Sequence, residues 1–301
     1  MTGPESKVRD GVILCGVFTG LIASLFTPLS ILTIWFLPLP FFLYTAKHSW
    51  PSAVAPAVVI SALTLLLLHP VWIFGVLFAA ATGMVMGAIY RLSTSTGTDV
   101  VLAGLVVGTA VLLTGLIAAE YGYGALSEFH KLWREQWELA AELIQRAVPD
   151  APVPALPPLA AVIPLFLSVM TVPTVLLSAW AGRRLLVRHG FSEKRLPPFY
   201  RWRFPKTFLY FYILAGVAAF LFWEKSGAYP FFAGLFSILD IMFVVQGFSF
   251  LAFLLHRKGK SRGWLWLALF ALFITPAAIL LLLLGILDVG TRLREWMEEK
   301  R

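Results

Sequence analysis

Charged residues are scarce in this chain, and their scarcity excludes a soluble globular protein. Asp, Glu, Lys and Arg make up 13% of the 301 residues, whereas hydrophobic residues make up 59%. A soluble domain has about 25% charged and about 45–50% apolar residues. An interior this apolar needs lipid as its solvent, so the composition predicts an integral membrane protein with one membrane domain over residues 1–301.

Cysteine and the common enzyme motifs are also missing or nearly so. Cys15 is the one cysteine, which excludes an internal disulfide and a metal cage built from thiolates. The chain has no G-x-S-x-G, H-E-x-x-H or G-x-x-x-x-G-K-[ST] motif and no Rossmann glycine pattern. We therefore predict that the protein is not an enzyme and that it holds neither a metal nor a cofactor.

Long apolar segments are what the chain has in abundance. A membrane-spanning helix needs about 20 predominantly apolar residues. The nine segments are 11–26, 30–45, 52–68, 71–90, 100–119, 159–181, 207–223, 231–255 and 264–287. They predict an all-α transmembrane helix bundle of about eight or nine spans: six over 1–182, a basic loop over 183–206, and three more with a tail over 207–301. The first two segments are short, and one re-entrant hairpin is the alternative for them.

The basic loop sets the predicted topology. Arg183–Lys206 holds eight Lys or Arg residues and one acid, and basic clusters between spans mark the cytoplasmic side of a membrane. Alternation from this loop places sixteen of the 24 Lys and Arg residues inside. We therefore predict a plasma-membrane protein with a cytoplasmic N-terminus and an outside C-terminus, whose charged tail, Thr291–Arg301, has no chemical role. We expect the net charge of +8 to interact with anionic lipid headgroups and not with nucleic acid.

An amphipathic helix is predicted near residues 124–147, between the fifth and sixth spans. Its apolar residues recur at spacings of three and four, and charges occupy the other face. The apolar stripe contains Leu126, Phe129, Trp133, Trp137, Ala140, either Leu143 or Ile144, and Ala147. A connector on the outer surface and a lid over an outward-facing pocket are both consistent with this pattern.

Small residues four apart mark close helix contacts in three spans. They are Gly16, Gly20 and Ser24; Ala79, Gly83 and Gly87; and Gly104 and Gly108. Such faces allow helix backbones to approach closely in lipid. They indicate internal packing or, for one of the sets, a face for a partner protein.

Asp240 is the ionisable residue in the middle of an apolar segment, which makes it the leading candidate for a ligand or proton site. Ser237 lies near it on the same helical face, and Gln246 is a hydrogen-bonding neighbour on the same segment. An internal hydrogen bond that fixes helix packing is the alternative role for Asp240. Glu120, Glu224 and Asp288 fall at outer span ends, where we expect them to be exposed.

Aromatic and basic residues alternate at the end of the basic loop. Arg201, Trp202, Arg203 and Lys206 predict an interfacial anchor on lipid headgroups or a docking site for a cytoplasmic protein. The two roles are not separable from the sequence.

Two stretches carry a family resemblance. LPPFYRWRFPK (Leu196–Lys206) and FSILDIMFVVQGFSFLAFLLHRKG (Phe236–Gly259) resemble the YybS-like family of uncharacterised bacterial multi-pass membrane proteins. Their marks are Leu-Pro-x-Phe-x-x-Trp-x-x-Pro and Val-Gln-Gly-x-Ser. This resemblance implies no activity and no catalytic residue.

The first six segments also resemble, more loosely, the substrate-binding membrane subunits of energy-coupling-factor transporters. That resemblance implies a small-molecule substrate and a partner membrane protein docked on Gly16, Gly20 and Ser24. We therefore predict a non-enzymatic, small-molecule-binding transport component. The alternative is a membrane scaffold or regulatory protein that docks cytoplasmic partners through the basic loop.

Overall fold

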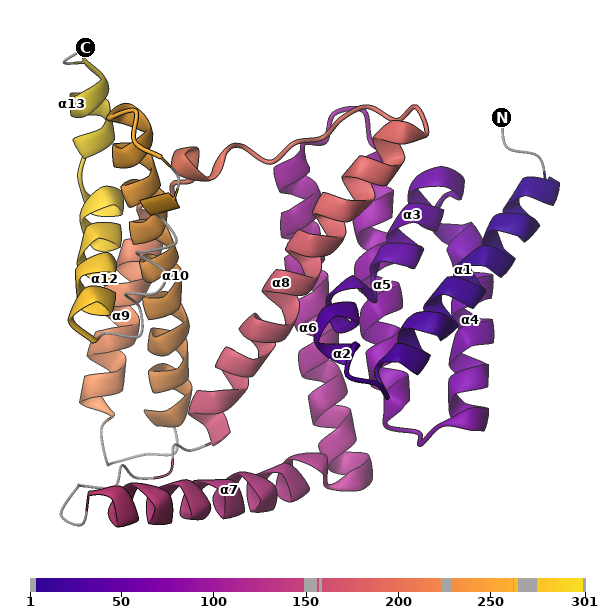
Figure 1. The fold of residues 1–301 in the computed structure, drawn as a ribbon, viewed down its shortest axis with the longest axis horizontal. Coiled ribbons are helices and arrows are strands. Elements are labelled where there is room, and N and C mark those ends of the chain that lie inside the picture. The colour runs from indigo at the N-terminus through magenta and orange to yellow at the C-terminus, as the bar shows by residue number, and fades with distance from the viewer. Residues whose placement is uncertain are drawn as a thin grey trace. The chain divides into compact units, whose positions relative to one another are not determined.

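Helices and the loops between them make up the part that the computed structural model describes, residues 4–148, 156, 159–222, 229–261, 263–264 and 275–299. The all-α prediction is confirmed for these residues (Figure 1). The helices are α1 (Pro4–Ser24), α2 (Ser30–Thr33), η1 (Ile34–Phe36), α3 (Leu39–His48), α4 (Trp50–Leu67), α5 (Trp72–Arg91), α6 (Gly97–Tyr123), α7 (Ala125–Ala147), α8 (Leu159–Arg188), η2 (Phe199–Arg201), α9 (Thr207–Leu221), α10 (Tyr229–Arg257), α12 (Thr275–Gly290) and α13 (Leu293–Glu299).

Internal contacts divide the chain into two compact units. Unit 1 contains Met1–Leu156 and Leu167–Leu196, and unit 2 contains Pro157–Phe166 and Pro197–Arg301. One boundary falls inside the predicted basic loop, between Leu196 and Pro197. Each half of that loop therefore belongs to a different unit.

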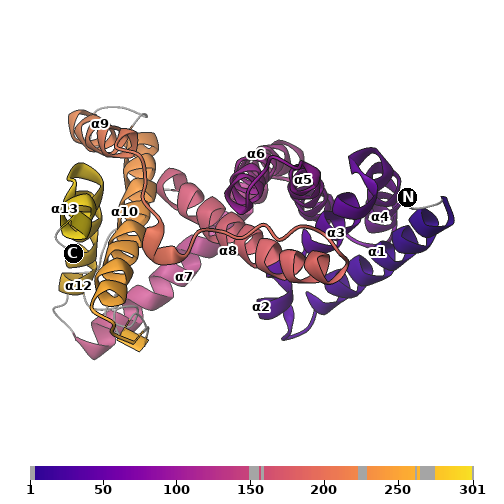
Figure 2. The ribbon, with the colours of Figure 1, turned by 90° about the horizontal axis from the view of Figure 1, so that it is seen from above.

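Unit 1 is built around α5, which packs against α3, α4 and α6 (Figure 2). Glycine allows the closest of these contacts. A Cβ atom on Gly83 would overlap the Pro38 carbonyl oxygen, and one on Gly87 would overlap the Phe42 carbonyl oxygen. These two glycines of the predicted small-residue set therefore pack inside the protein against α3.

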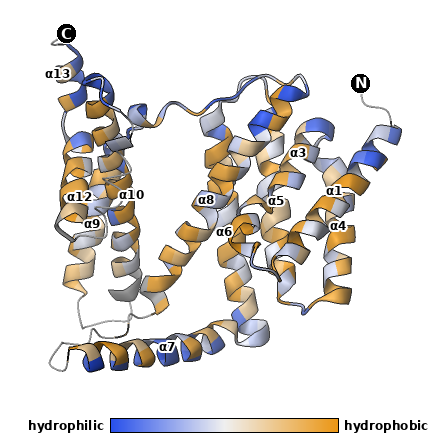
Figure 3. Cartoon of the chain, in the orientation of Figure 1, coloured by the Kyte–Doolittle hydropathy of each residue, from blue (hydrophilic) through white to orange (hydrophobic). Residues whose placement is uncertain are grey.

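Hydrophilic residues gather where α1 begins and α8 ends, at the upper end of unit 1 in Figure 3. At the end of α5, Arg91 donates a hydrogen bond to the Lys47 carbonyl oxygen at 3.2 Å. Between α3 and α1, His48 Nε2 lies 2.8 Å from Asp10 Oδ2. This hydrogen bond holds the pKa of Asp10 below its usual value. The ends of α1, α3 and α5 that carry the predicted inside charges therefore meet.

Unit 2 is built around α10, which packs against α9, α12 and η2. Backbone contact between α10 and α12 is permitted by two glycines. A Cβ atom on Gly247 would overlap the Leu281 carbonyl oxygen, and one on Gly285 would overlap the Phe243 carbonyl oxygen. Three residues beyond Phe243 and three residues beyond Gly285, Gln246 bonds to Asp288. The two helices therefore run in the same direction.

Among the described residues, six helical segments are long and apolar enough to cross a membrane. They are Ser30–His48, Trp50–Leu67, Trp72–Arg91, Gly97–Tyr123, Val162–Arg188 and Phe232–Arg257. Thr207–Leu221 and Ala277–Gly290 are shorter apolar helices. These segments support a membrane protein, while the total of eight or nine spans stays a prediction. Most of the residues between α10 and α12 in the predicted ninth segment lie outside the described residues.

The predicted position of the C-terminal tail is wrong relative to the basic loop. Arg203 contacts the tail, with Nη1 at 2.9 Å from Glu295 Oε1 and Nη2 at 2.7 Å from the Thr291 carbonyl oxygen. The reason is that α12 runs parallel to α10 and ends beside the same loop. The tail and Pro197–Lys206 therefore lie at the same end of unit 2, and not on opposite sides of a membrane.

Candidate functional site: the clamped basic segment

The second half of the basic segment is held to α10 by two buried polar side chains. Gln246 Oε1 accepts a hydrogen bond from the Phe204 amide, and Gln246 Nε2 donates to the Trp202 carbonyl oxygen, both at 3.1 Å. Ser249 Oγ lies 2.8 Å from the Phe199 carbonyl oxygen and 2.7 Å from that of Trp202. The residues of Val-Gln-Gly-x-Ser thus bind the backbone of Leu-Pro-x-Phe-x-x-Trp-x-x-Pro, which joins the two marks of the family resemblance.

A buried ion pair completes this clamp. Arg294 binds Asp288 through two atoms, with Nε 2.7 Å from Oδ1 and Nη2 2.5 Å from Oδ2. Arg294 Nη1 also donates to the Tyr200 carbonyl oxygen at 2.7 Å. Asp288 is 0% exposed and Arg294 is 7% exposed. A buried ion pair offsets its desolvation only when its remaining hydrogen bonds are made. Here the Tyr200 carbonyl oxygen and the side chains of Ser249 and Gln246 make them.

Two residues of this clamp were missed by sequence reasoning. Asp288 was expected to be exposed at a span end, and the tail was expected to have no chemical role. Both expectations are wrong, because α13 returns Arg294 to the end of α12, where it covers the Asp288 carboxylate. The available signal was an acid and a base six residues apart at the end of an apolar segment.

The first half of the basic segment is held to unit 1. Lys194 Nζ donates hydrogen bonds to the Ser95 carbonyl oxygen at 2.8 Å and to the Leu92 carbonyl oxygen. Tyr90 donates through its hydroxyl to the Ser192 carbonyl oxygen at 2.9 Å. Burial lowers the pKa of Lys194, while the Asp99 carboxylate opposes that shift. Lys194 thus serves as a backbone clamp, although its charge alone suggested a surface position.

The four predicted headgroup or partner residues divide into two kinds. Arg203 is occupied by Glu295 and Thr291, and Trp202 Nε1 donates to the Pro197 carbonyl oxygen at 2.8 Å. Arg201 and Lys206 are exposed. Arg184 and Arg188, near the end of α8 in unit 1, are exposed as well. Each unit therefore presents exposed cations from a backbone that buried side chains hold in place.

The structure does not bring Asp240, Ser237 and Gln246 together as one site. Asp240 Oδ1 accepts a hydrogen bond from the Tyr212 hydroxyl at 2.8 Å, between α10 and α9. Ser237 is exposed and donates to the Ala233 carbonyl oxygen of its own helix at 2.9 Å. Gln246 belongs to the loop clamp. The observed contacts of Asp240 are those of a helix-packing hydrogen bond.

The small residues of α1 differ from those of α5 and α6. Gly104 and Gly108 face Met86 and Thr171, respectively, in the interior of unit 1. A Cβ atom on Gly16 or Gly20 would meet nothing within 4 Å. Ser24 donates to the Thr33 hydroxyl at 2.7 Å. Gly16 and Gly20 therefore form an open face of α1 among the residues that the structure describes.

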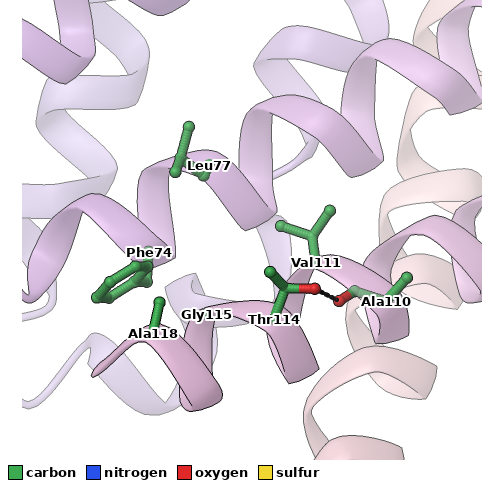
Figure 4. Close-up of a pocket in the computed structure, with 7 residues that line it drawn as sticks. All are labelled: Phe74, Leu77, Ala110, Val111, Thr114, Gly115 and Ala118. Carbon is green, nitrogen blue, oxygen red and sulfur yellow. Dashed lines mark hydrogen bonds between the residues drawn. The ribbon is translucent and has the colours of Figure 1, made fainter. Parts of the chain in front are cut away.

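Cavities occur among the described residues of unit 1. The first, of about 240 Å³, lies between α5 and α6 and is shown in Figure 4; it is lined by Phe74, Leu77, Ala110, Val111, Thr114, Gly115 and Ala118. The Thr114 hydroxyl donates to the Ala110 carbonyl oxygen, so this cavity offers apolar contacts. The second, of about 160 Å³, borders Arg183 and Lys194. Both of those cations already bind protein groups.

Comparison with known proteins identifies a family of membrane proteins. The model of the predicted membrane protein family DUF2232 matches residues 16–289. The chain belongs to this family. Searches of curated proteins and of solved structures gave no match.

Proposed function

We propose that this protein is a non-enzymatic membrane scaffold whose basic segment binds an acidic surface of a cytoplasmic protein. The proposal places Arg183–Lys206 and both chain termini on the cytoplasmic side of the cell membrane. Basic clusters beside spans have that orientation. Lys47, Arg91 and Lys194 lie at the same end of unit 1, which supports this orientation.

The observation that carries the proposal is the double clamp on this segment. A loop whose only role is to set membrane topology requires its positive charges but does not require its backbone to be held in one conformation. Here Lys194 fixes the segment on unit 1, and Gln246, Ser249 and Arg294 fix it on unit 2. Holding exposed Arg201 and Lys206 on a fixed backbone lowers the entropy that a partner must overcome on binding.

Photo-crosslinking in cells tests this proposal. A photoreactive residue at Lys206 is expected to capture one recurrent protein, and Arg201→Glu is expected to abolish that adduct by reversing a neighbouring charge. Arg134→Glu on α7 is the matched control, because it makes the same charge change at an exposed site outside the segment. Adducts with lipid alone, or a protein adduct that persists in Arg201→Glu, would contradict the proposal.

A small-molecule-binding transport component is the second candidate, and the cavity between α5 and α6 favours it. Its volume of about 240 Å³ is below the roughly 300–1,000 Å³ of ordinary ligand sites. Its apolar lining suits a small apolar molecule or an acyl chain. Energy for transport would come from a separate partner, since the chain has no nucleotide-binding motif.

Mass spectrometry of the purified protein tests this second function. A bound molecule is expected to be retained in mild detergent and to be lost in Ala110→Leu, which fills the cavity. Val106→Leu is the control on the same helix, since Val106 is 69% exposed and does not line the cavity. Finding no bound molecule in repeated preparations, or equal retention in both variants, would count against transport.

A further inference from the structure

Helix α7 follows α6 directly after a sharp bend at Gly124, which we call the elbow. Gly124 ends α6 in the left-handed conformation, with φ of 60°. Glu120 then accepts hydrogen bonds from the Leu126 and Ser127 amides at 2.7 and 3.2 Å and from the Ser127 hydroxyl at 2.8 Å. A carboxylate at a helix N-terminus satisfies amides that have no partner within the helix. The elbow sets α7 crosswise to α6 (Figure 1).

The apolar face of α7 is only partly covered by protein, with Trp133 and Trp137 half-buried. None of the residues of α7 is buried. On its apolar face, Phe129 is 44% and Ile144 is 42% exposed. Phe129, Trp133 and Trp137 form a row, with ring centroids 6.2 and 6.0 Å apart. Solvation by water of an uninterrupted apolar stripe along a helix about 35 Å long is unfavourable.

The position of α7 within unit 1 indicates what covers this face. Gly97, at the start of α6, contacts Arg195 and Leu196 of the basic segment. Helix α6 is apolar enough to cross a membrane, so its other end, where α7 begins, lies at the opposite membrane surface. The outer side of α6 near that end is itself apolar and exposed, with Ile117 at 48% and Tyr123 at 48%. Exposed apolar residues therefore lie on both helices at this end of α6, with Ile117 and Tyr123 before the elbow and Phe129 after it.

We infer that α7 is an interfacial anchor, which inserts its apolar face into the lipid leaflet opposite the basic segment. The row of Phe129, Trp133 and Trp137 then lies at the level of the headgroups and upper acyl chains, where Trp is favoured. The charges of the other face pair along the helix, with Lys131 2.7 Å from Glu128 and Arg146 3.5 Å from Glu142. This face has no excess of basic residues, so insertion depends on apolar contact and not on anionic lipid.

Spin-label accessibility of the full-length protein in nanodiscs of zwitterionic lipid tests this inference. On a Cys15→Ala background, single labels replace Ala140 or Ile144 on the apolar face and Glu138 or Glu142 on the charged face. Because α7 contributes no buried residue, these changes leave the core of unit 1 intact. The labels at 140 and 144 are expected to collide preferentially with oxygen, which partitions into lipid. Those at 138 and 142 are expected to collide preferentially with a water-soluble nickel chelate.

Two results overturn the inference. Low accessibility of positions 140 and 144 to both reagents means that protein covers the face, as expected if α7 packs as a lid over the rest of the molecule. Preference for the nickel chelate on both faces means that α7 lies in water. Fluorescence of an environment-sensitive dye on the same four cysteines gives an independent reading, with a blue shift expected at 140 and 144 only.

Discussion

Arg294 is the residue with the most consequences for stability, because it neutralises Asp288 and binds the basic segment at the same time. Arg294→Met leaves a fully buried carboxylate without a charge partner. Breaking a buried ion pair from one side costs about 3–5 kcal/mol. We expect a corresponding loss in the free energy of unfolding, measured by denaturant or thermal unfolding in detergent. Arg292→Met, two residues away with 81% side-chain exposure, is expected to cost no more than about 1 kcal/mol.

A double variant separates charge from packing at this site. In Asp288→Leu with Arg294→Met, neither charge is left buried alone, so part of the lost stability is expected to return. The recovery is expected to be incomplete, because Arg294 also donates to Tyr200 and Ser249. Equal destabilisation by Arg294→Met and Arg292→Met would show that the pair does not hold the tail.

Sequence reasoning reached some of these residues and not others, for physical reasons. Gln246 was recognised as a hydrogen-bonding residue because an amide in an apolar helix needs a polar partner. Asp288 was misplaced because a carboxylate at the end of an apolar segment looks the same whether water or a returning Arg covers it. That distinction depends on whether Arg294 bonds to Asp288, which a spacing of six residues permits but does not require.

Among the helices, the contact between α10 and α12 is the one most sensitive to a single methyl group. Gly247→Ala places a Cβ atom against the Leu281 carbonyl oxygen, and backbone yields less readily than a side chain. We expect a loss of about 1–3 kcal/mol from overpacking. Gly16→Ala is the control, since it meets nothing within 4 Å and Ala is the better helix former by about 1 kcal/mol. Both are measured by thermal unfolding in detergent.

The control also informs on the open face of α1. If Gly16→Ala reduces crosslinking to a protein partner in cells while leaving thermal stability unchanged, the glycine face of α1 contacts that partner. Thermal destabilisation by Gly16→Ala that matches Gly247→Ala would contradict the packing described for α10 and α12.

Helices were predicted best where a local pattern determines them. The amphipathic helix expected near 124–147 is α7, Ala125–Ala147, because spacings of three and four along the chain specify one face. The direction of α12 was not predictable in this way. An apolar segment of 24 residues, Trp264–Leu287, reads as one span from composition alone. Its close contact with α10 depends on Gly247 and Gly285, which lie far apart in the sequence.

For the molecule in its membrane, the paired ends of unit 2 make a definite prediction about topology. Arg203 contacts Glu295, and Arg294 contacts the Tyr200 backbone. We therefore predict that the tail and Pro197–Lys206 share one membrane surface. On a Cys15→Ala background, cysteines at Arg201 and Glu299 are expected to react alike with a membrane-impermeant maleimide, in intact cells and in permeabilised cells.

A cysteine at Glu142 on α7 is expected to show the opposite pattern, because α6 separates α7 from the basic segment. If a cysteine at Glu299 is labelled in the same pattern as the cysteine at Glu142, the alternating nine-span topology is restored. That result would contradict the contacts of Arg294. If the cysteine at Glu299 is labelled in the same pattern as the cysteine at Arg201, the three apolar segments of unit 2 cannot each cross the membrane once. Three single crossings would place the two ends of unit 2 on opposite sides. The charge count along the sequence does not decide this point, because the tail has both acids and bases, and its position depends on Arg294 binding Asp288.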